Sequence, residues 1–85
     1  MPARVDHFVF TFDRLSGQLT TSRPVVYESS SEAEEVAEVN ASEHAGALVL
    51  ALTRDQQTGD LLEAKVLRVF GEFNMAAVIG TFGED

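Results

Sequence analysis

Cysteine is absent from this chain of 85 residues, and its absence removes two classes of site. A disulfide framework needs paired cysteines, and thiolate metal centres need cysteine sulfur. The lack of cysteine also fits a reducing compartment, so we expect a cytoplasmic location. A chain of this length makes one domain, residues 1–85, and hides only about 60–65% of its unfolded surface. Further burial in a second copy is therefore favoured.

Long apolar runs are also missing. The longest, residues 45–52, is far too short to cross a bilayer, so we expect no membrane partner. The opening residues Met1, Pro2, Ala3 and Arg4 are not followed by a long apolar stretch. We therefore expect no secretory signal.

Basic residues are scarce. The formal net charge is −8, and no Lys or Arg lies between Arg23 and Arg54. Glutamates are concentrated in this interval instead. Such a block excludes direct binding to nucleic acid phosphates, but it permits binding to a basic protein surface.

A repeated turn frame is the strongest signal that is present. Residues 13–19 and residues 55–61 both read Asp-x-x-(Ser/Thr)-Gly-x-Leu. This frame suits a four-residue hairpin loop, because Asp bonds back to nearby amides and Gly17 or Gly59 takes positive φ without a Cβ clash. Two β-hairpins are therefore predicted.

The first hairpin begins with residues 7–13, which alternate and place three phenylalanines on one face. This period of two is typical of a half-buried strand whose aromatic side faces the core. The return strand, residues 19–27, contains Pro24, which cannot donate a ladder hydrogen bond. We expect this strand to lie at an edge, or to end at Pro24 and restart.

A helix is predicted over residues 32–45. Ser29 and Ser31 supply caps, and Gly46 is expected to close the helix in left-handed conformation. The expected buried stripe consists of small residues, so the helix should lie close to the sheet. That stripe is Ala33, Val36, Ala37 and Asn40, with His44 as a further candidate, whereas Glu32, Glu35, Glu38 and Glu43 are expected to face water.

The second hairpin consists of residues 47–53 and 61–70, which carry apolar side chains on both faces. Both faces of the sheet therefore need cover, and one helix covers only one. Residues 74–85 form an apolar extension beyond the core, residues 5–73. We expect this extension to be a fifth strand or an arm donated to a neighbour. The predicted fold is α+β: ββαββ, an antiparallel sheet of 4–5 strands with one helix on one face.

Candidate catalytic groups have structural explanations. His7 and His44 lie on different elements without metal-ligand spacing, and Asp13 and Asp55 are explained by the turns. No phosphate loop, nucleophile elbow or zinc motif is present. We therefore expect no enzyme activity, no metal and no cofactor.

A helix ending in His44-Ala45-Gly46, an apolar strand, the turn at Asp55 and a strand closing on Gly71 resemble short uncharacterised bacterial and phage-associated ββαββ proteins. The resemblance covers residues 30–73. It implies the layout of the fold and no established activity. Some small phage proteins of this layout bind and inhibit host proteins.

Three functional hypotheses follow from these patterns. The first is a protein–protein interaction module that forms a homodimer through the uncovered sheet face or the terminal segment. The second is an acidic decoy that binds a basic partner through its glutamate-rich helix, and the third is a small-molecule binder with a pocket between helix and sheet. The residues predicted for self-association are Met75, Val78, Ile79 and Phe82, and those predicted for the decoy are Glu32, Glu35, Glu38 and Glu43.

Overall fold

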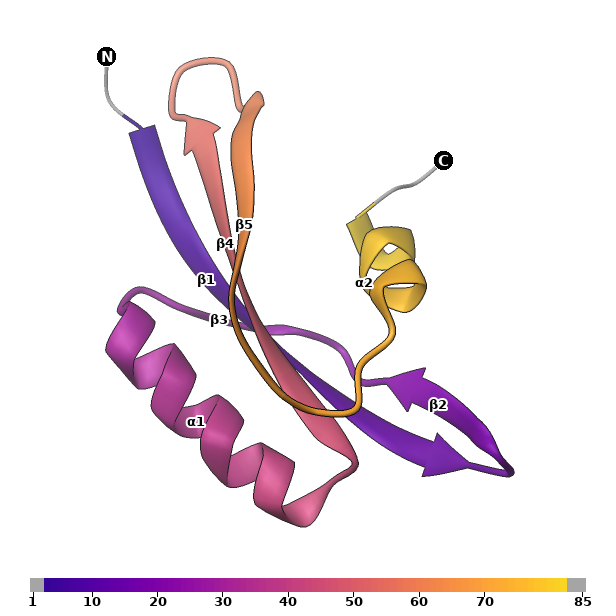
Figure 1. The fold of residues 1–85 in the computed structure, drawn as a ribbon. Helices are drawn as coiled ribbons and strands as arrows, with labels where there is room; N and C mark the ends of the chain where they lie inside the picture. The colour runs from indigo at the N-terminus through magenta and orange to yellow at the C-terminus, as the bar shows by residue number, and fades with distance from the viewer. Residues whose placement is uncertain (1–2, 83–85) are drawn as a thin grey trace.

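The fold is an antiparallel sheet with one helix on each face (Figure 1). The structure is a computed structural model that describes residues 3–82, with side chains described through residue 80. The α+β class and the two hairpins joined by a helix are confirmed. The elements are β1 (Ala3–Leu15), β2 (Gln18–Thr21), β3 (Val25–Tyr27), α1 (Ser30–Glu43), β4 (Gly46–Asp55), β5 (Leu61–Gly71) and α2 (Met75–Phe82).

The strand order is β2-β1-β4-β5, and β3 also pairs with β1. β2 and β3 are two pieces of one return strand along the outer edge of β1, with Leu15 paired to Gln18 and His7 paired to Tyr27. The interruption includes Pro24, which has no N–H to donate to the ladder. The predicted break in this strand is confirmed.

β1 and β4 form the centre of the sheet. Their antiparallel register runs from Ala3 opposite Asp55 to Phe12 opposite Gly46. β4 is buried from Gly46 through Leu52, as expected for a strand with neighbours at both edges and cover on both faces. β5 pairs with the other edge of β4 and ends the sheet.

The turn between β4 and β5 has the predicted chemistry. The Asp55 carboxylate accepts the backbone N–H groups of Gln57 at 2.7 Å and Thr58 at 3.2 Å. Gly59 has φ +79°, in the region that an L-residue enters only at a cost. This copy of the repeated frame therefore acts as a hairpin loop.

The first copy of the frame closes differently from the prediction. The loop is the two residues Ser16 and Gly17, whose φ angles are 55° and 82°. Two successive positive φ angles give a turn whose twist matches that of the flanking strands. Asp13 consequently stays within β1, opposite Thr20, and its carboxylate contacts His44 instead of the loop amides.

Helix α1 begins and ends two residues earlier than predicted, at Ser30 and Glu43, with one of the two predicted serine caps in place. Ser29 is the N-cap, and its hydroxyl accepts the N–H of Glu32 at 3.4 Å. The helix ends at Glu43, and His44 has extended backbone angles. Gly46 does not close the helix in left-handed conformation, because it is the first residue of β4. A Cβ there would collide with the backbone of Glu72, so glycine is required for a close approach of chains.

The α1 side of the sheet is packed with small residues. Ala33 and Ala37 of the helix are fully buried against Val9, Ala47 and Val49. The predicted close approach of the helix to the sheet is confirmed. Of the other stripe residues, Val36 is half-buried, and Asn40 donates a hydrogen bond to the Thr11 hydroxyl at 3.1 Å.

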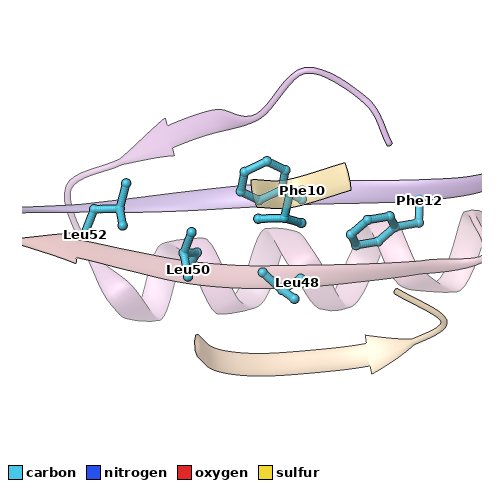
Figure 2. Close-up of a cluster of buried hydrophobic side chains, with 6 residues drawn as sticks. Phe10, Phe12, Leu48, Leu50 and Leu52 are labelled. Carbon is cyan, nitrogen blue, oxygen red and sulfur yellow. The ribbon is translucent and has the colours of Figure 1, made fainter. Parts of the chain in front are cut away.

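The opposite side holds the larger core cluster. Figure 2 shows two phenylalanines of β1, Phe10 and Phe12, gathered with the leucines of β4, and Val78 of α2 completes the cluster. The extension beyond residue 74 was expected to be a strand, and this is wrong: residues 75–82 form α2. Asn74 caps it by accepting the N–H of Ala77 at 3.3 Å, and alanines at 76 and 77 favour a helix. The cluster is Phe10, Phe12, Leu48, Leu50, Leu52 and Val78.

Candidate functional site

Strand β5 carries an exposed apolar surface. Each side chain from Leu61 to Val66 is exposed, and the exposed fraction is 58% at Leu62 and 43% at Val66. Single exposed apolar residues are ordinary on protein surfaces, but several of them along one edge strand favour an interaction site. We define the β5 surface as Leu61, Leu62, Val66 and Val69.

Two members of the β5 surface continue the larger core cluster toward solvent. Val66 lies opposite Leu50, and Val69 lies opposite Leu48. Paired residues in a sheet share a face, so these two valines lie on the α2 side. Helix α2 covers the phenylalanines and the buried leucines and leaves these valines exposed.

The residues predicted for self-association in the terminal segment have unequal positions. Val78 is 1% exposed and belongs to the chain's own core, and Met75 packs against the same cluster. Ile79 is 62% exposed. The side chain of Phe82 lies outside the described residues. Of this set, Ile79 is therefore the described residue most open to a partner.

The acidic residues of α1 gather beside an open groove of about 470 Å³ between helix and sheet. Glu32, Glu35 and Glu38 are exposed and line the groove. Glu43 is also exposed but is not among the lining residues. Three of the four predicted glutamates are therefore close together, on the sheet-facing flank of α1.

One arginine crosses this groove. Arg68 of β5 approaches the Glu34 carboxylate with 3.7 Å between nitrogen and oxygen, and its guanidinium lies 5.1 Å from the centre of the Phe70 ring. The guanidinium offsets part of the carboxylate charge. What remains is a negatively charged groove with one aromatic wall, which suits a basic side chain.

The two histidines make separate contacts. The His44 ring nitrogen Nδ1 lies 2.7 Å from the Asp13 carboxylate, and both side chains are exposed. The Nδ1 of His7 lies 3.4 Å from the carbonyl oxygen of Tyr27. Among residues 3–82, no three His, Asp or Glu side chains are grouped so that they could hold a metal ion.

Comparisons with known proteins give no relative. No family model matches the chain, and neither the curated proteins nor the solved structures contain a match. Within the part of the chain that the structure describes, neither helix combines the length and the apolar character that a membrane crossing requires.

The sequence alone indicates the apolar character of the β5 surface but not its exposure. The sequence shows the apolar character of residues 61–70 on both faces, and it offers the uncovered sheet face as one of two self-association sites, but the residues named for self-association all lie in the terminal segment. The missing information was the position of β5 at the edge of the sheet. Three charged residues within this strand, Glu63, Lys65 and Arg68, are the sequence signal for an exposed edge.

Proposed function

We propose that this protein is a non-enzymatic interaction module that binds a second copy of itself through the β5 surface. One observation carries the proposal: an edge strand whose side chains from Leu61 to Val66 are all exposed, with apolar residues at four of those six positions. The cysteine-free composition is compatible with a role in the cytoplasm.

An edge strand offers a second source of affinity besides its side chains. The backbone N–H and C=O groups on the free side of β5 have no strand beside them in the described part of the chain. Such groups bind another extended strand by continuing the sheet. A small domain gains most from this arrangement, because its own core is limited.

The test compares the same substitution at two exposed valines. Val66→Asp introduces a charge into the β5 surface, whereas Val39→Asp introduces it on α1, where Val39 is 55% exposed. We expect the wild-type protein and Val39→Asp to be dimers and Val66→Asp to be a monomer, as measured by sedimentation equilibrium. Circular dichroism verifies that both variants are folded. A wild-type monomer at all concentrations would refute the proposal.

Ile79→Asp distinguishes the β5 surface from the terminal segment. Ile79 is exposed on α2, so this variant should fold and remain a dimer if β5 makes the contact. Dissociation of Ile79→Asp, with Val66→Asp still dimeric, would place the interface on α2 instead.

A second candidate function is supported by the groove beside α1. Glu32, Glu35 and Glu38 line it together with Phe70, which is a suitable surface for a basic partner. An oligolysine peptide is a direct probe, and its binding should weaken steeply as salt rises. Glu35→Lys with Glu38→Lys should abolish binding, whereas Glu43→Lys, outside the groove, should retain most of it. Equal losses in the two variants would reject the groove as the binding site.

A further inference from the structure

The sequence around Ala64 is complementary to itself when reversed. Up to four residues from Ala64, positions at equal distances on either side are either both apolar or oppositely charged. The order of acidic and basic residues is inverted across this point, while the apolar residues are mirrored. Read outward from Ala64, the pairs are Glu63 and Lys65, Leu62 and Val66, Leu61 and Leu67, and Asp60 and Arg68.

We infer that β5 pairs antiparallel with β5 of a second copy, with Ala64 of one copy directly opposite Ala64 of the other. This register specifies the contact in the self-association proposed above and rests on it. A two-fold axis through this point brings each residue of the regular stretch 63–65 opposite its mirror position. Glu63 then faces Lys65 of the second copy, and the same contact is repeated on the other side of the axis.

The structure makes this stretch available. Every side chain from Leu61 to Val66 is exposed, and β5 is the last strand of the sheet. The end of the sheet that contains the start of β5 extends past α1 (Figure 1). The pairing with β4 has two irregularities, and at each of them β5 carries one extra residue, Leu62 or Leu67, that has no partner in β4. Between them β5 is regular from Glu63 to Val66, the stretch around the axis.

The faces of the strand agree with the register. Ala64 and Val66 lie opposite Leu52 and Leu50 of β4, so they are on the α2 side, whereas Glu63 and Lys65 lie opposite Thr53 and Ala51 on the α1 side. A two-fold axis perpendicular to the sheet places the α1 sides of the two copies on the same side of the joined sheet, and likewise the α2 sides. The charged pairs therefore meet on the α1 side of the joined sheet, and an apolar row is extended on the other side.

The same residues disfavour the neighbouring registers. If one strand slips by two residues, the two-fold axis passes through Glu63 or through Lys65. Glu63 then lies opposite Glu63 of the second copy, or Lys65 lies opposite Lys65. Like charges directly opposite one another destabilise a strand pair. A slip by one residue would place opposed side chains on different faces. Charge thus selects the register centred on Ala64.

Charge exchange tests the register in solution. Glu63→Lys places lysine opposite Lys65, and Lys65→Glu places glutamate opposite Glu63, so each variant should raise the dimer Kd by roughly tenfold or more, about 1.4 kcal/mol. The double variant restores opposite charges and should recover most of the affinity. Glu43→Lys, a matched charge change outside β5, should leave the Kd unchanged.

Mixing the two single variants gives a sharper outcome. Glu63→Lys and Lys65→Glu are each self-repelling, but a dimer of one with the other restores both ion pairs. Native mass spectrometry should therefore show the mixed dimer in excess over either homodimer. A statistical mixture would contradict the register.

A single cysteine locates the two-fold axis, because the chain has no other cysteine. Directly opposite residues have Cα atoms about 4.5–5.5 Å apart, within disulfide reach, so Ala64→Cys should form a covalent dimer on mild oxidation. Val66→Cys, on the same face, would be roughly 13 Å from its own copy and should not crosslink. Efficient linkage by Val66→Cys, or by cysteine at position 63 or 65 in place of 64, would overturn the register while leaving self-association intact. A wild-type protein that sediments as a monomer would refute both the register and the proposed self-association.

Discussion

β4 and β5 are neighbouring strands, both rich in apolar residues, and they differ sharply in burial. β4 is buried at seven successive positions from Gly46 to Leu52, whereas β5 is exposed at six successive positions from Leu61 to Val66. The two strands are paired residue by residue over most of their length. Exposure is therefore decided by position in the sheet, since β4 has a neighbour on each side and β5 has one.

The comparison shows which strands the two helices shield from solvent. Helix α1 lies over β1 and β4, and α2 lies over the phenylalanines and leucines of the same two strands. Little cover is left for β5. Several apolar side chains of β5 therefore stay exposed, and the proposed pairing with a second copy would bury them.

The largest difference between the strands should appear on truncation of leucine. Leu48→Ala removes a fully buried side chain of β4 and should lower the free energy of unfolding by about 2–5 kcal/mol. Leu62→Ala, on β5, should lower it by less than about 1 kcal/mol in the monomer. Urea titrations at low protein concentration measure both. Similar losses would show that β5 is buried in the monomer.

A smaller effect is expected where the two strands converge. Gly46→Ala places a Cβ against the backbone of Glu72, just beyond β5, and should cost about 1–3 kcal/mol of unfolding free energy. Gly80→Ala is the matched control, because nothing lies within 4 Å of a Cβ at that helical position. It should stabilise the protein by about 0.5–1 kcal/mol. Thermal melts of the two variants should therefore shift in opposite directions.

The smallest effect concerns the turn that joins the two strands. Asp55→Ala removes the acceptor of two backbone N–H groups and should cost about 1 kcal/mol. Asp13→Ala, in the other copy of the frame, removes only an exposed contact with His44 and should cost about 0.5 kcal/mol or less. Chemical denaturation of the pair resolves this difference. Equal losses of unfolding free energy would mean that Asp13 and Asp55 stabilise their turns to the same extent.

Local chemistry predicted most of the fold. The hairpin at Gly59, the serine cap of α1 and the break at Pro24 each depend on a few adjacent residues, and each is where the sequence indicates. The central position of β4 was also readable, because both of its faces are apolar. In these places, propensity, pattern and turn geometry agree.

The errors arose where tertiary contacts decide the conformation. Gly46 resembles a helix-ending glycine, but it is required because Glu72 passes close to it. The apolar run of residues 75–82 also suits a strand, yet the Asn74 cap, the two alanines and the burial of Val78 in the core make it a helix. The exposure of β5 was not predicted either, because it depends on strand order and on the small extent of α2, neither of which is local.

The pairing of β1 with β4 also bears on how the chain matures. Ala3 lies opposite Asp55, so the middle of the sheet closes only after the ribosome has released the segment through that residue. Until then, the phenylalanines of β1 cannot pack against the leucines of β4, and they remain exposed on the nascent first hairpin. The nascent chain is therefore prone to aggregation until β4 has been synthesised and can pair with β1.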